Sequence, residues 1–172
     1  MEAILAIDSN NGLSKNGTIP WNSTKDLNFF YKTTKNNIVI MGKNTYFSIP
    51  EKRRPLKDRL NIILTRTPNL FRNELSNNVI FTNKENIHTY ILQNRHKFLT
   101  FCPSLSSEFK IIIIGGKQVY DQYIPLCDTV WLTLIKENHS CDLFFDYDLE
   151  KEFKEVSSIE DDDIQICKYI KK

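Results

Sequence analysis

Three apolar stretches of the sequence each run directly into residues that could hold a phosphate group. These junctions lie at residues 38–45, 62–67 and 112–118. Lys43 and Arg66 supply positive charge at the first two, and a glycine pair at the third lets a ligand approach the backbone closely. In an open α/β sheet, ligands bind beyond the carboxyl ends of the strands, where helix N-termini offer free N–H groups. One such junction is more often a plain turn, but three together favour a dinucleotide phosphate site.

A single carboxylate, Asp26, lies among large apolar residues near the start of a predicted helix. Ser23, three residues earlier, resembles one half of a capping box, and the helix dipole favours an acid in the first turn. The alternative is that Asp26 points into a cleft walled by Trp21, Leu27 and Phe30, where it would bind a flat, partly cationic heterocycle through paired hydrogen bonds. Spacing alone leaves both roles open and favours the structural one.

The segment 53–59 is rich in cations, which suggests a nucleic-acid patch or an anion-binding arginine. Glu51 and Asp58 dilute its charge, and no matching basic helix accompanies it. A solvated loop is therefore the simplest interpretation, with anion binding as the specific alternative.

The hydrophobic pattern predicts the strands and helices that must position these residues. Short, continuous apolar runs predict buried strands at 3–7, 38–41, 60–64 and 110–114. Helical periodicity and capping residues predict helices at 24–33, 43–48, 84–93 and 117–124. Further strands without intervening helices are predicted at 129–135, 153–157 and 164–169. The alternation predicts one α/β domain over residues 1–172, with a central, mostly parallel sheet, antiparallel C-terminal strands and flanking helices. The segment 94–108 fits no hydrophobic period and is either an insertion or an undetected helix.

Composition and charge exclude several classes of protein. With 172 residues, 41% hydrophobic, and a net charge of +2, the chain fits one globular domain without a large polyanion-binding surface. We therefore expect no nucleic-acid partner. The cysteines form no C-x-x-C pair and follow no recognisable signal peptide, which predicts reduced thiols in a cytoplasmic protein without a metal. The longest aliphatic run, at 111–114, is too short to span a membrane.

Motifs along the chain, in order, resemble those of the dihydrofolate reductase family from residue 3 to about residue 145. The resemblance includes a loop that ends in Pro20-Trp21, Asp26-Leu27 at the start of a helix, and the double glycine Gly115-Gly116, where the family has a cis peptide. Further matching segments lie at 39–45, 48–52, 54–57 with residue 59, 64–66, 119–120, 132–133 and 141–145.

The resemblance implies an NADPH-dependent oxidoreductase that converts 7,8-dihydrofolate to 5,6,7,8-tetrahydrofolate, with hydride transfer to C6 and protonation at N5. Such a reaction supports one-carbon metabolism and thymidylate synthesis, and the resemblance also implies a monomer that binds antifolates. By the same resemblance, Asp26 would bind N3 and the 2-amino group of the pterin, Thr133 would hydrogen-bond that carboxylate, and Trp21 would act through water near the pterin carbonyl.

The resemblance also assigns binding residues. The substrate-binding positions are Ile4, Leu5, Asp26, Leu27, Phe30, Ile49, Leu56, Arg59, Ile114 and Thr133. The cofactor-binding positions are Ala6, Ile7, Gly12, Leu13, Ser14, Lys15, Asn16, Gly17, Thr18, Lys43, Asn44, Thr45, Leu64, Thr65, Arg66, Ile114, Gly115, Gly116, Lys117, Gln118, Val119 and Tyr120. Among these, Arg59 would grip the α-carboxylate of the folate tail, and Lys43, Thr65 and Arg66 would favour NADPH over NADH.

Some positions depart from the family pattern. Ser14 and Asp58 replace common glycines, Tyr46 replaces a common tryptophan, and Leu143 and Asp146 replace a frequent threonine and proline. Asp58 could compete for the neighbouring Arg59 and weaken binding of the folate tail.

Two other functions remain as alternatives. A pyrimidinone reductase on the same fold would share the double glycine but lack the Pro-Trp plus Asp arrangement and the tail arginine. A non-catalytic binding module would have lost parts of the catalytic set, and none is missing here.

Overall fold

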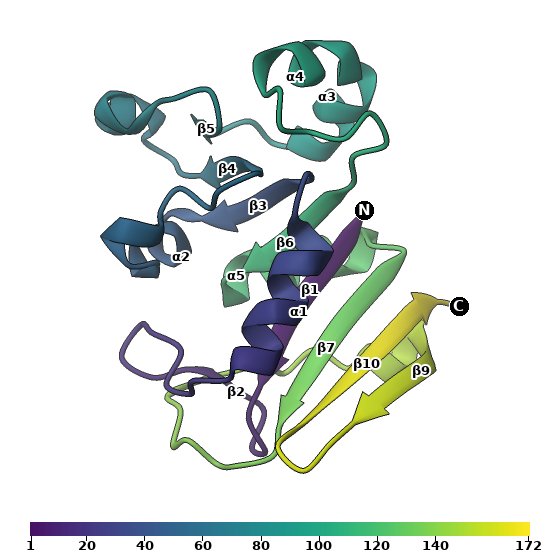
Figure 1. Cartoon of the computed structure of the whole chain (residues 1–172). Coiled ribbons are helices and arrows are strands. Elements are labelled where there is room, and N and C mark those ends of the chain that lie inside the picture. The colour runs from purple at the N-terminus through teal and green to yellow at the C-terminus, as the bar shows by residue number, and fades with distance from the viewer. The chain divides into compact units, whose positions relative to one another are not determined.

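The computed structural model describes all residues from Met1 to Lys172, and these form two compact units. The first unit comprises Met1–Thr33 and Ile113–Lys172, and the second comprises Thr34–Ile112. Each unit has its own group of paired strands (Figure 1). The expectation of one domain over residues 1–172 stays a prediction.

In the first unit the strands change from parallel to antiparallel pairing. Its strands are β1 Glu2–Ile7, β2 Gly12–Ser14, β7 Thr129–Ile135, β8 Leu143–Phe144, β9 Phe153–Glu160 and β10 Ile164–Lys171. β1 and β7 are parallel, with Glu2 opposite Thr129 and Ile7 opposite Leu134. β10 is antiparallel to both β7 and β9, which confirms the prediction for the C-terminal strands. β2 and β8 form a separate small sheet.

The first unit has four helical segments, and the first two along the chain agree closely with the predicted helices at 24–33 and 117–124. The four segments are α1 Thr24–Thr34, α5 Lys117–Tyr123, the 3-10 helix η3 Ile124–Leu126 and α6 Leu149–Glu152. Ser23 caps α1: its Oγ accepts a hydrogen bond from the Asp26 N–H at 3.2 Å, as the capping pattern predicts.

The second unit is built on parallel strands. Its strands are β3 Ile38–Gly42, β4 Leu60–Leu64 and β5 Val79–Thr82, and β6 Ile111–Gly115 leads from this unit into the first. β4 lies between β3 and β5 and is parallel to both. The helical segments are α2 Lys43–Ser48, η1 Glu51–Arg53, η2 Pro68–Glu74, α3 Ile87–Gln93 and α4 Arg95–Phe101.

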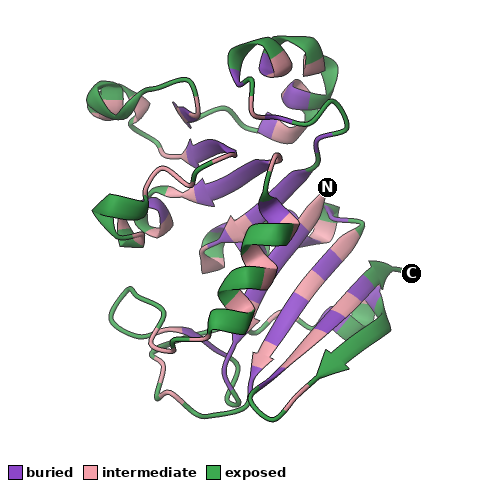
Figure 2. Cartoon of the chain, in the orientation of Figure 1, coloured by how far each residue is buried: buried purple, intermediate pink, exposed green.

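Burial explains why continuous apolar runs predicted the strands correctly. In β3 the residues from Ile38 to Met41 have no exposed surface, and Leu60, Ile62 and Ile63 of β4 are equally buried. Figure 2 shows both strands coloured almost entirely as buried. Each such aliphatic side chain contributes about 1.5–3 kcal/mol relative to an exposed one, so these runs anchor the sheet whose ends carry the site residues.

Short or weakly patterned elements escaped the sequence analysis. The predicted helix at 84–93 begins only at Ile87, and the segment 94–108 contains α4, so the undetected helix was the correct alternative. β2, β5, β8 and α6 have only two to four residues each, too few to establish a hydrophobic period.

The thiols are unpaired in this fold. Cys102, Cys127 and Cys167 are buried, and Cys141 is half-buried. Burial raises the pKa of Cys127 to about 12 and the pKa of Cys141 to about 11, so these thiols are weak nucleophiles at neutral pH. No three His, Cys, Asp or Glu side chains are grouped to hold a metal ion. None of the helices combines the length and the apolar character that a membrane crossing requires.

A buried carboxylate, Asp8, organises the turn between β1 and β2. Its Oδ1 accepts hydrogen bonds from the N–H groups of Asn10 and Gly12, at 2.9 and 2.7 Å, and its Oδ2 accepts one from His139 N–H at 2.9 Å. Burial opposes ionisation, but these backbone donors outweigh it and lower the pKa of Asp8. A Cβ at Gly12 would lie 2.8 Å from Asp8 Oδ1 and against Cys141, so this position requires glycine.

We expect Gly12→Ala to reduce the free energy of unfolding by about 2–3 kcal/mol, because the added methyl group overpacks this turn. Gly17→Ala serves as a control. Gly17 has a φ of +79° but open space around its would-be Cβ, so alanine there should cost only about 1 kcal/mol of backbone strain. Urea unfolding of both variants checks the difference. Equal losses would mean that the contact with Asp8 and Cys141 does not constrain residue 12.

Candidate active site

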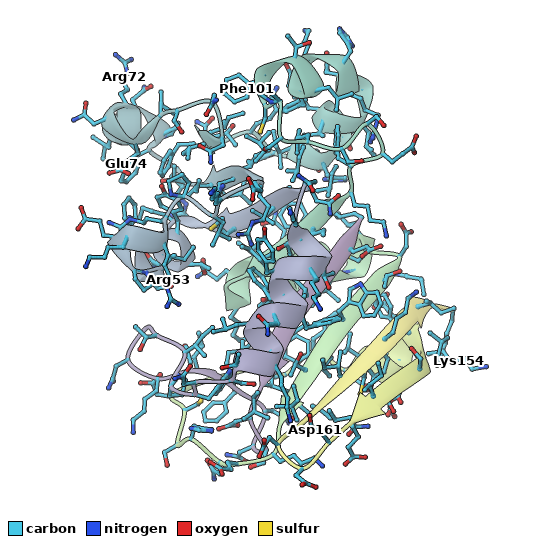
Figure 3. The ribbon with its side chains drawn as sticks, in the orientation of Figure 1. Arg53, Arg72, Glu74, Phe101, Lys154 and Asp161 are labelled. Atoms are coloured by element: carbon cyan, nitrogen blue, oxygen red, sulfur yellow. The ribbon has the colours of Figure 1, made fainter.

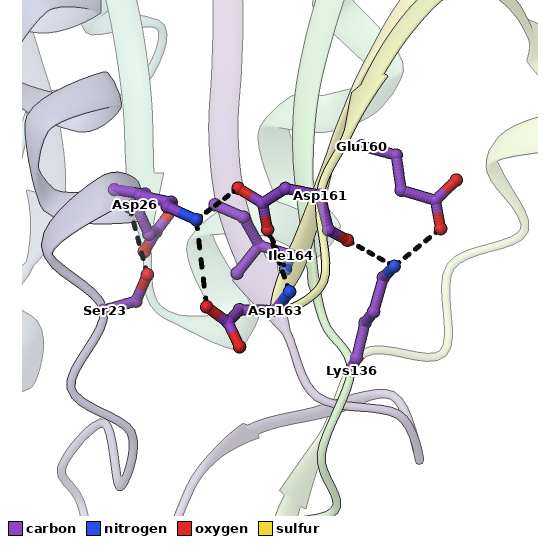
Figure 4. A network of polar contacts seen from close by, with 8 residues as sticks. Ser23, Asp26, Lys136, Glu160, Asp161, Asp163 and Ile164 are labelled. Carbon is purple, nitrogen blue, oxygen red and sulfur yellow. Dashed lines mark hydrogen bonds and ion pairs between the residues drawn. The ribbon is translucent and has the colours of Figure 1, made fainter.

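Asp26 lies in the first turn of α1, where the chain presents its carboxyl group toward β7. The helix starts at Thr24 because Ser23 caps it, and Figure 4 shows the Ser23–Asp26 contact beside the β9–β10 turn. Burial raises the pKa of the half-buried Asp26 carboxyl, and the Thr133 hydroxyl opposes this by lowering it. A carboxyl group with a raised pKa in partly apolar surroundings can exchange a proton nearer to neutral pH than an exposed aspartate.

Thr133 is 1% exposed, and it lies on β7 beside Ala6 of β1. Its Oγ1 makes no hydrogen bond of standard geometry, although the hydroxyl is near enough to Asp26 to lower the pKa of that carboxyl. The resemblance implied a hydrogen bond between Asp26 and Thr133, and the structure places the two groups near each other without a bond of standard geometry.

Other residues assigned to the substrate differ in their burial. Ile4 and Leu5 are each 4% exposed, Ile114 and Phe30 are half-buried, and Leu27 is 50% exposed. Leu27 therefore presents much of its side chain to solvent.

Trp21 precedes α1 and has a buried indole nitrogen. Its Nε1 has no hydrogen-bond partner within the protein, and its ring packs edge-on against His139 with centroids 5.6 Å apart. An orphaned donor of this kind is costly unless it meets an acceptor. The indole N–H is therefore suited to a ligand or to a water bound with a ligand.

The double glycine joins β6 to α5 through a cis peptide bond, which confirms the expectation drawn from the resemblance. Gly115 has a φ of +121°, and a Cβ there would lie 3.2 Å from the hydroxyl of Tyr120. Tyr120 is buried and donates a hydrogen bond to the Ile4 carbonyl at 2.9 Å, so it cannot move aside easily. Gly115 is therefore required both by its positive φ and by the close packing of its backbone against the Tyr120 ring.

At the start of α5, Lys117 lies between two carboxylates. Its Nζ is 2.9 Å from Asp121 and 2.6 Å from Asp146. Asp146 is one of the departures from the family pattern, and here it supplies an ion pair that a proline could not. Lys117 is therefore neutralised within the protein.

The loop that follows β1 is tied to the segment around residue 142. Asn16 N–H donates to Asp142 Oδ2 at 2.9 Å, and Asp142 N–H donates to the Ser14 carbonyl at 3.0 Å. Lys15 and Thr18 close a short bridge within the loop. Ser14, which replaces a common glycine, thus takes part through its backbone alone.

In the second unit, the parallel register brings two of the predicted phosphate-binding junctions together. Gly42 at the end of β3 pairs with Leu64 at the end of β4. Lys43 and Arg66 are both exposed, so their charges lie at the same edge of this part of the sheet. Thr65 Oγ1 accepts a hydrogen bond from Thr67 N–H at 3.2 Å, which shapes the turn.

Arg59 is held in one orientation by the structure around it. Arg59 is only 5% exposed. Its Nε donates a hydrogen bond to the Lys57 carbonyl at 2.9 Å, and a terminal nitrogen donates one to Thr34 Oγ1 at 3.0 Å. Asp58 has a φ of +59°, a left-handed conformation that glycine adopts more readily. The substitution of glycine by Asp58 thus preserves the backbone turn.

Asn61 supports the segment that carries Arg59, and it was not predicted from the sequence. It is fully buried on β4; its amide accepts a hydrogen bond from Leu56 N–H at 3.0 Å and donates one to the Leu56 carbonyl at 2.9 Å. These bonds fix the segment that carries Leu56 and Arg59. The signal available in the sequence was a lone polar residue inside an apolar strand.

Comparison with known proteins identifies relatives over nearly the whole chain. A sequence model of the dihydrofolate reductase family matches residues 1–170. The chain is 34% identical to a dihydrofolate reductase of Aedes albopictus, over 94% of this chain and 85% of the relative, and 32% identical to that of Drosophila melanogaster, over 90% and 82%. In structure it resembles the Enterococcus faecalis dihydrofolate reductase in complex with NADP(H) and RAB-propyl. The TM-score is 0.73 at 23% identity, covering 99% of this chain and 95% of the other, which shows a shared fold.

The raised pKa of Asp26 predicts a change in stability with pH. Above the ordinary pKa of 3.8, an unfolded chain ionises this carboxyl while the folded chain retains its proton, so stability falls as pH rises toward the folded pKa. Asparagine does not ionise, so Asp26→Asn removes this loss of stability. We therefore expect the variant to gain stability relative to the native protein as pH rises from about 4 toward the pKa of Asp26 in the folded protein, as urea unfolding at each pH would measure. A relative loss toward pH 7 would show that the ionised carboxylate stabilises the fold.

Proposed function

Because the chain belongs to the dihydrofolate reductase family, we propose that it reduces 7,8-dihydrofolate to 5,6,7,8-tetrahydrofolate with NADPH. The observation that carries this proposal is Asp26, an acid with a raised pKa in the first turn of α1 beside Thr133. The proposal includes a monomeric, cytoplasmic enzyme of one domain whose ligands are small molecules, antifolates among them, without a nucleic-acid or membrane partner.

Asp26 positions the pterin and prepares it for protonation. Its two carboxylate oxygens match the adjacent N3–H and 2-amino donors of the ring, and paired charge-assisted bonds of this kind fix both distance and orientation. The negative charge favours the cationic ring that forms when N5 takes a proton, and Thr133 supports the ionised carboxylate. The buried N–H of Trp21 would donate to a water at the pterin carbonyl.

The residues assigned to NADPH fit that cofactor. Bound NADPH supplies the hydride that C6 of the pterin receives. The cis Gly115-Gly116 turn lies between β6 and α5, and Lys43, Thr65 and Arg66 offer the cations and hydroxyl that a 2′-phosphate needs at one sheet edge.

Arg59 is proposed to bind the carboxylate of the folate tail. A guanidinium offers a planar fork that matches a carboxylate better than an ammonium group does. The bonds from Arg59 to the Lys57 carbonyl and Thr34 hydroxyl hold that plane in place before the ligand arrives, which reduces the entropy cost of binding.

The catalytic assignment is tested by NADPH oxidation with dihydrofolate. Asp26→Asn should lower kcat/KM by about 100-fold or more at pH 7, because the amide cannot carry the negative charge, and acidic pH should recover part of the loss by protonating the substrate in solution. Binding of NADPH should remain unchanged. Native protein without dihydrofolate turnover would refute the proposed reaction; turnover of a pyrimidinone substrate instead would favour the related reductase. If Asp26→Asn turns over dihydrofolate as fast as the native protein, the catalytic role of Asp26 is refuted, but the proposed reaction is not.

Cofactor preference is tested at Arg66. Arg66→Ala should raise the KM for NADPH by about 10–100-fold, equivalent to losing a charged hydrogen bond of about 1.5–3 kcal/mol, and should leave the KM for NADH nearly constant. Arg72→Ala is the matched control, since Arg72 is also exposed and projects from η2 away from the ribbon (Figure 3). An equal effect of Arg66→Ala on both cofactors would argue against a 2′-phosphate contact.

A further inference from the structure

α1 contacts β7 through two side-chain pairs with matched spacing. Asp26 and Phe29 are three residues apart and share one face of α1, while Trp131 and Thr133 are two residues apart and share one face of β7. Asp26 faces Thr133, whose hydroxyl lowers the pKa of the carboxyl, and Phe29 packs edge-on against Trp131 with ring centroids 5.6 Å apart at 62°. α1 therefore faces β7 at the Asp26 carboxyl and packs against it about one turn later, at Phe29.

Trp131 is held by charged groups on both neighbouring strands. Its indole N–H donates to Glu2 Oε2 of β1 at 2.9 Å, and Lys168 of β10 places Nζ 5.0 Å from the ring centroid. The registers explain this arrangement, because Trp131 pairs with both Ile4 and Lys168, and Glu2 lies on the same face of β1 as Ile4. A half-buried indole is thus fixed from two directions by a hydrogen bond and a cation–π contact.

We propose that Trp131, fixed by Glu2 and Lys168, is a positioning residue that sets the height and rotation of α1 and so places the Asp26 carboxyl for its role in the proposed reaction. Phe29 and Asp26 are separated by about 4.5 Å along a rigid helix, at 1.5 Å per residue. A shift at Phe29 is therefore transmitted directly to Asp26. Displacements of about 1 Å at a catalytic group can cost about 100-fold in rate.

The other fastening of α1 is weaker. Lys25, next to Asp26, pairs with Asp161 at 2.7 Å and with Asp163 at 3.8 Å in the β9–β10 turn (Figure 4). The Lys25 side chain is 57% exposed and that of Asp163 79%, so water and salt screen these charges. The Phe29–Trp131 contact carries no such screened charge, so it supports α1 at any ionic strength.

The test compares three single variants and one double variant. Trp131→Leu removes the aromatic contact and the bond to Glu2, and it should lower kcat with dihydrofolate about 10-fold while changing the KM for NADPH less than twofold. Trp131→Phe retains an aromatic partner for Phe29 and should recover kcat to within about threefold of the native value. Phe29→Leu should reproduce the loss, and the double variant Phe29→Leu with Trp131→Leu should lose no more than either alone, as two members of one contact do.

A measurement independent of turnover separates this proposal from the proposed function. Carbon-13 NMR titration of the Asp26 carboxyl should give a lower pKa in Trp131→Leu than in the native protein, because a loosened helix exposes the carboxyl. Leu149→Ala, a core truncation on α6, is the control: it should reduce stability without changing this pKa or kcat. If the native protein has no reductase activity but the pKa shift is present, positioning stands and the proposed reaction fails. If native turnover is present and Trp131→Leu changes neither kcat nor the pKa, the positioning role is refuted.

Discussion

The proposed chemistry depends on one carboxyl group that must be ionisable and yet withdrawn from water. Asp26 meets this demand through a balance in which burial raises its pKa and Thr133 lowers it. An exposed aspartate would bind a cationic heterocycle weakly because water screens the charge, whereas a fully buried one would remain protonated. The first turn of α1 provides the intermediate position, and the contacts of α1 with β7 hold it there.

At two turns, neighbouring side chains leave no space for a residue larger than glycine. Tyr120 supports Gly115 from beneath and bonds to the Ile4 carbonyl. Asp8 collects three N–H groups at the turn where Gly12 must lack a side chain. In both places a buried polar group fixes a glycine-containing turn, which provides a rigid surface without a bound ligand.

The departures from the family pattern have local explanations. Asp58 adopts the left-handed conformation of the glycine it replaces, and Asp146 forms an ion pair with Lys117. Tyr46 is buried in an aromatic cluster with Phe47 and Phe81, so its ring fills space in the core of the second unit. None of these substitutions changes Asp26 or Thr133.

The sequence by itself determined the long buried strands, the helices at 24–33, 43–48 and 117–124, and the identity of Asp26 and the double glycine as candidate site residues. Apolar runs and capping residues are local signals, and the order of motifs identified the family. Only the tertiary structure decided that Lys43 and Arg66 lie at one sheet edge, because strand register joins residues far apart in the chain. The same holds for Asn61 beneath the Arg59 loop and for Trp131 against Phe29. In the sequence, neither Asn61 nor Trp131 can be told from an ordinary strand residue, because their partners are brought to them only by the packing of the folded chain.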